Sequence, residues 1–121
     1  MSVIVLWADG GDPRTEMTSA AEQLAALLPS ARVVNAFTSV SSSIVRNPGS
    51  AEKPSVIVCS DDDQARAVVM GLAEDLGFSG INGGALRFAR YTEGFGVLWT
   101  ALAYDAGYGE RITYRVYVAE D

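Results

Sequence analysis

Histidine is absent from this chain of 121 residues, and cysteine and lysine occur once each, as Cys59 and Lys53. The absence of histidine excludes the Ser-His and Cys-His nucleophile systems and removes the commonest metal ligand. A zinc site made from Cys59 and carboxylates is not expected. A single cysteine also excludes an intrachain disulfide, so we expect a reducing, cytoplasmic setting and no metal.

Positive charge and long apolar runs are also scarce. Nine Lys and Arg stand against fifteen Asp and Glu, which gives a net charge of −6 at pH 7. Nucleic acid and anionic membrane surfaces are therefore not expected partners, because both are recognised by clustered basic side chains. The apolar run at residues 3–7 is too short for a membrane span, and it lacks the basic flank of a signal peptide.

What is present is an ordinary globular balance of 49% hydrophobic and 20% charged residues, and we expect one domain over residues 1–121. Apolar and periodic segments predict strands at residues 3–7, 32–37, 56–59, 78–84 and 112–118, and helices at 19–28, 61–76 and 86–106. Strands apolar on both faces that alternate with amphipathic helices predict an α/β fold with a mostly parallel sheet.

Short motifs near the predicted strands have structural explanations. Gly10 and Gly11 follow the first strand, but no G-x-G-x-x-G occurs, so a plain turn is favoured over a dinucleotide phosphate site. The run 61–63 of three aspartates is explained by the start of a helix, with Asp61 and Gln64 at the spacing of a capping box. Ser19 and Glu22 have the same spacing, and Cys59 is expected to pack in the core.

The predicted helix at 86–106 is long and aromatic, and Glu93 lies in its most apolar stretch, between Thr92 and Gly94. Aromatic residues at helical spacing usually pack in a core. For Glu93 two interpretations remain open. Its carboxyl group pairs with an arginine, or it faces a pocket, where an acid or base role is available to it.

Several segments together resemble one known family over about residues 18–116. They read SAAEQLAALLP from Ser19, ARVVNAFTSV from Ala31, VCSDDD from Val58 and GAL from Gly84, followed by Arg90 and Glu93. These segments resemble the deazaflavin-dependent NADP reductases. The resemblance implies the later half of a Rossmann-type domain with its C-terminal extension, whereas the glycine fingerprint and the NADP phosphate site belong to the earlier half. It therefore implies a truncated Rossmann-like fold.

The resemblance also implies where a ligand lies. In the family, the segments matching Phe37–Thr38 and Gly84–Leu86 line the place where deazaflavin meets nicotinamide. The sequence departs from the family at Thr38, where an Asn or His is usual, and at Ala85, where the turn has a proline. We therefore expect a large, flat, apolar pocket between the loop after the second strand and the long helix.

The leading hypothesis is a cofactor-independent enzyme that catalyses the cyclisation, cycloaddition or isomerisation of a large apolar, polyketide-like metabolite. The residues that we expect to act in catalysis are Glu93, Tyr91 and Thr38. The residues that we expect to bind the substrate are Phe37, Ser39, Leu86, Phe95, Trp99 and Tyr104. Two alternatives remain: a residual deazaflavin or NADP oxidoreductase that works with a partner subunit, and a non-catalytic binding protein. We also expect a homodimer or larger homo-oligomer, paired through an exposed strand at 3–7 or 112–118.

Overall fold

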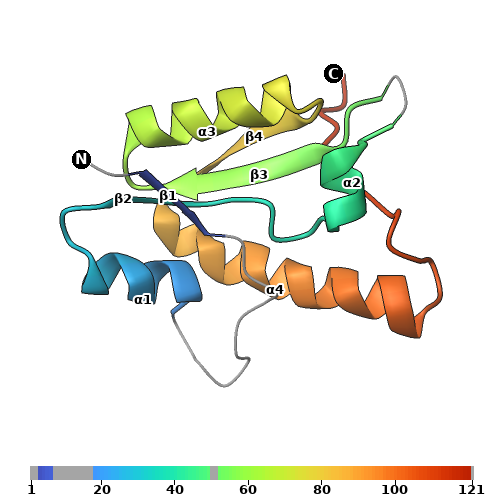
Figure 1. The fold of residues 1–121 in the computed structure, drawn as a ribbon, viewed down its shortest axis with the longest axis horizontal. Helices are drawn as coiled ribbons and strands as arrows, with labels where there is room; N and C mark the ends of the chain where they lie inside the picture. The colour runs from blue at the N-terminus through green and yellow to red at the C-terminus, as the bar shows by residue number, and fades with distance from the viewer. Residues whose placement is uncertain (1–2, 7–17, 50–51, 121) are drawn as a thin grey trace.

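Four strands form one sheet in the computed structural model, which describes residues 3–6, 18–49 and 52–120 (Figure 1). The strands are β1 (Val3–Leu6), β2 (Arg32–Asn35), β3 (Ser55–Ser60) and β4 (Ser79–Gly84). The helices are α1 (Ala20–Leu27), α2 (Ser42–Arg46), α3 (Asp63–Asp75) and α4 (Ala89–Thr100). A 3₁₀ turn (Leu86–Phe88) precedes α4 and a π-helical turn (Ala101–Asp105) follows it, which confirms the long helical stretch predicted at 86–106.

The sheet has the order β1-β2-β3-β4, and its strands do not all run the same way. β1 pairs with β2 in parallel, as β3 does with β4, but β2 and β3 are antiparallel through Val34–Ser60 and Asn35–Cys59. The sheet, which the sequence predicts to be mostly parallel, is therefore a mixed one. Between β2 and β3 the described residues form one helix, the five-residue α2, which is too short to serve as a crossover helix. Because β2 runs antiparallel to β3, the loop after β2 leads away from the carboxyl ends of β3 and β4, although Asn35, the last residue of β2, still pairs with Cys59 near the end of β3.

Helices cover both faces of the sheet. α3 lies on one face, while α1 and α4 lie on the other (Figure 1). The core under α3 is made of small and branched side chains from the sheet and from one stripe of the helix, namely Val34, Val56, Val58, Ala65, Val69, Ala73 and Phe78. A smaller cluster on the other face joins Ala21, Val33, Leu86 and Ala89. Burial of these apolar surfaces drives the layers together.

The helix starts agree with the capping signals in the sequence. Ser19 Oγ accepts a hydrogen bond from the Glu22 N–H at 3.1 Å, as the capping box predicts. α3 begins one residue later than expected, because the capping residue is Asp62, whose Oδ1 accepts from the Ala65 N–H at 2.8 Å. Among the described residues, no helix is both long enough and apolar enough to span a bilayer.

The prediction of a strand at residues 112–118 is wrong. This part of the chain forms no strand, and it is bonded to β3 at Ser55, whose N–H donates to Tyr114 O at 2.9 Å and whose Oγ accepts from the Val116 N–H at 2.8 Å. In Figure 1 the C-terminal segment, residues 107–120, rises from the end of α4 past α2 towards the start of β3. The alternating pattern therefore reflects packing of one side against the domain. Trp7, Gly10, Gly11 and Pro13 lie outside the described residues.

Candidate functional site

A buried polar network closes the carboxyl end of β2. The Asn35 side chain is fully buried; its Nδ2 donates to Glu93 Oε2 at 3.3 Å and its Oδ1 accepts from Thr92 Oγ1 at 2.8 Å. Thr38 Oγ1 donates to the Thr92 carbonyl at 3.0 Å, so the loop after β2 is tied to α4 as well. Because buried polar groups are costly unless paired, this network fixes the position of the loop relative to the helix.

Glu93 is 1% exposed and joins three elements. Its Oε1 accepts from the Ala20 N–H at 2.9 Å, and its Oε2 accepts from the Ala21 N–H at 3.2 Å as well as from Asn35. Both interpretations left open by the sequence therefore miss the actual partners, which are the first N–H groups of α1. A carboxyl group held by three donors anchors α1 to α4 and β2, and it is poorly placed to exchange a proton with a substrate.

Arg90, which lies on α4 with Glu93, pairs with Glu22 and not with Glu93. Arg90 Nε and Nη2 hold the Glu22 carboxylate, with distances of 2.9 Å to Oε2 and 2.8 Å to Oε1. Hydrogen bonding from Arg90 lowers the pKa of Glu22 below its ordinary value, although partial burial opposes the shift. α4 is thus bonded to α1 at two places, through the buried carboxyl group of Glu93 and through the partly exposed ion pair of Arg90 with Glu22.

The loop after β2 carries two features that the fold does not explain. Phe37 has a φ of 60°, the left-handed backbone conformation that a bulky side chain rarely adopts. Ser39 is 2% exposed, and within the described part of the chain its Oγ has no hydrogen-bond partner. The Phe37 ring packs edge to face against Phe78 at 5.7 Å, so the strained residue is also held by the core. Three of the predicted site residues, Phe37, Thr38 and Ser39, are therefore adjacent and fixed in place.

The aromatic residues later in α4 and in the π-helical turn after it mainly hold the C-terminal segment. Phe95 packs edge to face against Tyr114 at 5.0 Å, and Trp99 Nε1 donates to the Ile112 carbonyl at 3.1 Å. Tyr104 OH donates to Glu110 Oε1 at 2.8 Å. Substrate binding by these three aromatic residues stays a prediction, and what the structure adds is a packing role for each of them.

Two other residues of the predicted site, Leu86 and Tyr91, lie in the 3₁₀ turn before α4 and in the first turn of α4. Tyr91 is largely exposed, with its ring 6.4 Å from that of Phe88. Leu86 is buried after β4, at the carboxyl ends of β3 and β4. Because β2 and β3 are antiparallel, the two segments that the resemblance brought to one pocket lie at opposite ends of β2.

Cys59 fits a structural role. It is fully buried, and burial raises the pKa of its thiol from 9.0 to about 11, so the reactive thiolate is disfavoured at neutral pH. A Cβ on Gly83 would lie 2.6 Å from Cys59 Sγ, so only glycine fits beside it. Among the described residues, no group of three or more His, Cys, Asp or Glu side chains is arranged to hold a metal ion.

Sequence reasoning missed Asn35 and Thr92, the two residues that link the loop to α4. A signal was present in the sequence. Asn35 interrupts the apolar run of a strand that is covered on both faces, and a polar side chain in such a place needs buried partners. Thr92 adjoins Glu93 on the helix, and no local pattern identifies its partner on β2.

Comparisons with known proteins find a similar fold among solved structures. No family model matches the chain, and no curated protein matches it. Among solved structures, it is similar to a protein from Arthrobacter sp. FB24 described as a "putative F420-dependent NADP reductase", with a TM-score of 0.83 and 25% identity. The match covers 96% of this chain and 57% of that one, so this chain spans little more than half of that protein. The similarity confirms a Rossmann-like α/β fold.

Proposed function

We propose that this protein binds a flat, apolar small molecule at the carboxyl end of β2 and converts it by holding it in a reactive conformation. The reaction class is an isomerisation, cyclisation or cycloaddition within one polyketide-like substrate. The product then has the same elemental formula as the substrate, and no oxidant, reductant or co-reactant is needed. One observation carries the proposal: the buried Ser39 hydroxyl has no hydrogen-bond partner among the residues that the structure describes.

An unpaired buried hydroxyl costs about 1–3 kcal/mol, and a strained backbone beside it adds a similar amount. Ser39 and Phe37 incur both costs within three residues of one loop. Costs of this kind concentrate at ligand sites, where a bound molecule supplies the missing partner. A ligand with a carbonyl or hydroxyl group beside Ser39 and Thr38, and an apolar body, matches these surroundings.

The described residues do not fit a dinucleotide held in the usual Rossmann manner. Such a cofactor places its pyrophosphate at the N-terminus of the helix that follows the first strand of the unit. In this chain the first N–H groups of α1 are already bonded, those of Ala20 and Ala21 to Glu93 and that of Glu22 to Ser19. Glu93 thus occupies the place that a phosphate group would take.

The remaining chemistry is positional. Glu93 is engaged by three donors, and Cys59 is buried with a raised thiol pKa. Holding a flexible substrate in a near-attack conformation contributes up to about 7–11 kcal/mol to a barrier without any charged catalyst. The Ser39 hydroxyl would polarise a carbonyl of the bound substrate, and the Thr38 hydroxyl, which donates to Thr92 O, would help to orient the loop.

The test is a comparison of metabolites between a strain that produces the protein and a strain that lacks it. We expect the deletion strain to lose one compound and to accumulate another of identical elemental formula. Purified protein should then convert the second compound into the first without added cofactor. A pair of compounds that differ by two hydrogen atoms would contradict the proposal.

A second candidate function is supported by the Arthrobacter protein described as a "putative F420-dependent NADP reductase", whose fold this chain shares. In that case the chain binds deazaflavin or NADP together with a partner subunit and carries out a redox step. Calorimetry with NADPH and with the deazaflavin cofactor separates the two functions. The leading proposal predicts no tight binding of NADPH by the isolated chain, whereas low-micromolar affinity would favour the redox function.

Self-association is a further proposal, and the structure narrows its route. Residues 112–118 form no strand, so of the two segments expected to pair only β1 remains; among the described residues β1 pairs only with β2. An exposed strand edge favours pairing with a second copy. Light scattering over a range of concentrations should show a dimer or larger oligomer, and a mass that stays at the monomer value would contradict it.

A further inference from the structure

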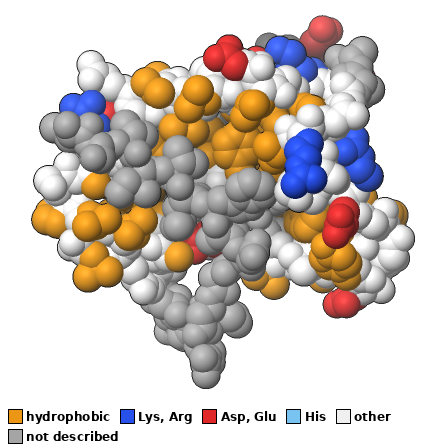
Figure 2. All heavy atoms as spheres, in the orientation of Figure 1, with side chains coloured by type: hydrophobic (Ala, Val, Ile, Leu, Met, Phe, Trp, Pro, Cys, Tyr) orange, Lys and Arg blue, Asp and Glu red, His pale blue; other side chains and the backbone are white. Residues whose placement is uncertain are grey.

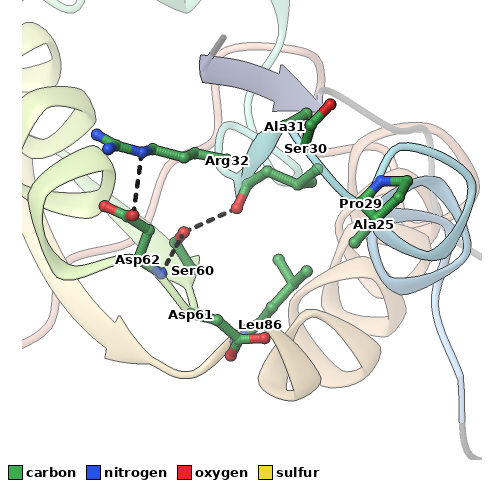
Figure 3. A pocket seen from close by; sticks show the side chains of 10 residues that line it. Ala25, Pro29, Ser30, Ala31, Arg32, Ser60, Asp61, Asp62 and Leu86 are labelled. Atoms are coloured by element: carbon green, nitrogen blue, oxygen red, sulfur yellow. Dashed lines mark hydrogen bonds and ion pairs between the residues drawn. The ribbon is translucent and has the colours of Figure 1, made fainter. Parts of the chain in front are cut away.

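A cavity of about 470 Å³ lies at the amino end of β2, away from the loop that carries Ser39. Its walls come from the end of α1, the first residues of β2, the turn after β3, and Leu86 (Figure 3). The cavity therefore sits outside the carboxyl ends of the parallel strands β3 and β4, where ligands bind in open α/β sheets. Its volume is in the range of small-molecule sites.

The polar wall has already used most of its hydrogen-bonding capacity. Ser60 Oγ donates to Val33 O at 2.7 Å and accepts from the Asp62 N–H at 3.1 Å. The Asp62 carboxylate caps α3 through Oδ1 and pairs with Arg32 Nε through Oδ2 at 3.2 Å (Figure 3). In Asp61, by contrast, Oδ1 accepts from the Leu86 N–H at 3.0 Å, and no other described residue bonds to its carboxylate. A ligand that meets this wall must therefore donate a hydrogen bond to Asp61.

The opposite wall is apolar and continues onto the surface of α1. Ala25, Pro29 and Leu86 line the cavity. Beside them, Leu27 and Leu28 of α1 and its C-terminal cap are 76% and 40% exposed. Figure 2 shows hydrophobic side chains gathered at the lower left of this face, where α1 lies. An apolar ligand body in the cavity is thus able to extend over this exposed patch.

The charge around the cavity indicates which kind of hydrogen-bond donor the ligand carries. The cavity is lined by two aspartates and one arginine, and the whole chain carries a net charge of −6, so its field attracts cations. We propose that this cavity is a second small-molecule site, and that it binds an organic ammonium ion with an apolar body. The ammonium group contacts Asp61, and the apolar part lies against Ala25, Pro29 and Leu86.

The probe is benzylamine, which is positively charged at neutral pH, and its matched control is benzyl alcohol, which has the same ring and no charge. Each is titrated into ¹⁵N-labelled protein while amide shifts are followed by NMR. We expect benzylamine to shift the amides of residues 25–33, 60–62 and 86, and to bind about fivefold more tightly than benzyl alcohol.

Two variants test the contact with Asp61. Asp61→Asn keeps an oxygen that accepts from the Leu86 N–H, so the fold is retained, but benzylamine should then bind no better than benzyl alcohol. Asp75→Asn makes the same charge change on the exposed end of α3 and should leave the preference for the amine intact. Shifts that are absent or lie elsewhere would overturn the proposal. Equal binding of the two probes, or an unchanged preference in Asp61→Asn, would also overturn it.

Discussion

The two ends of β2 differ in how their polar groups are paired and in whether they border a cavity. At the amino end, Ser60, Arg32 and Asp62 satisfy one another and surround a cavity. At the carboxyl end, Asn35 and Glu93 are paired within a packed network, and in the loop that follows the Ser39 hydroxyl has no partner among the described residues. The amino end is paired around a cavity, whereas the carboxyl end is strained and leaves one group unpaired.

This difference teaches that two kinds of signal identify a ligand site. A cavity with one unused acceptor indicates the polarity of a ligand but costs the protein little. A buried hydroxyl without a partner reduces the stability of the unliganded fold, and that cost is difficult to explain without a ligand. The carboxyl end of β2 is therefore the stronger candidate for the main function.

The largest effect is expected when the network at the carboxyl end is broken. Glu93→Ala leaves the N–H groups of Ala20 and Ala21 and the Asn35 amide without their acceptor, so the free energy of unfolding should fall by about 3 kcal/mol or more. Asp62→Ala, at the amino end, removes a helix cap and should cost about 1 kcal/mol. Urea denaturation measures both. Equal losses would mean that the two ends are held equally firmly.

Alkaline pH should weaken the protein through Cys59, which pairs with Asn35 across β2 and β3. Burial raises its thiol pKa from 9.0 to about 11, so the native state keeps a proton that the unfolded state loses. This contribution to stability is complete below about pH 9 and is lost as the pH rises towards 11, at about 1.4 kcal/mol per pH unit.

Urea denaturation between about pH 8 and about pH 11 measures this loss. Cys59→Ala should flatten the dependence in this range and leave the part due to Tyr114, whose pKa burial also raises. A curve for Cys59→Ala as steep as that of the unchanged protein would show that the thiol is not the source.

A smaller effect is expected at the ion pair between α1 and α4. Glu22→Gln removes the charge that Arg90 holds, at a site where both side chains are partly exposed, so the loss in unfolding free energy should be at most about 1 kcal/mol. Because Arg90 lowers the pKa of Glu22, this contribution is present at neutral pH and disappears as the pH falls below the ordinary value of 4.5. Thermal denaturation at pH 7 and at acidic pH checks both statements.

Much of the fold follows from local patterns in the sequence. The apolar runs of β2 and β3, the capping box at Ser19 and the spacing of Ala65, Val69 and Ala73 in α3 each identify their elements without knowledge of the rest of the chain. Segment 112–118 also alternates like a strand, but whether such a segment joins a sheet depends on a free partner edge. That is a property of the assembled fold.

The site was harder to predict, for a topological reason. A parallel sheet would bring Phe37 and Leu86 to one edge, and the antiparallel pairing of β2 with β3 separates them. The fate of Glu93 depends on three donors, two from α1 and one from β2, that are distant in sequence. Sequence indicated that Glu93 was unusual, and only the assembled network shows what holds it.

The central claim concerns Ser39, and its most direct test pairs Ser39→Ala with Ser60→Ala. Both serines are buried, but among the described residues the Ser60 hydroxyl has two hydrogen-bond partners and the Ser39 hydroxyl has none. In purified protein, Ser39→Ala should raise the free energy of unfolding by about 1 kcal/mol, and Ser60→Ala should lower it by about 1–2 kcal/mol. In the producing strain, Ser39→Ala should lower product formation per molecule of protein about tenfold, because the substrate loses its partner, while Ser60→Ala should not. A more stable Ser39→Ala protein with unchanged product formation would contradict the proposed site.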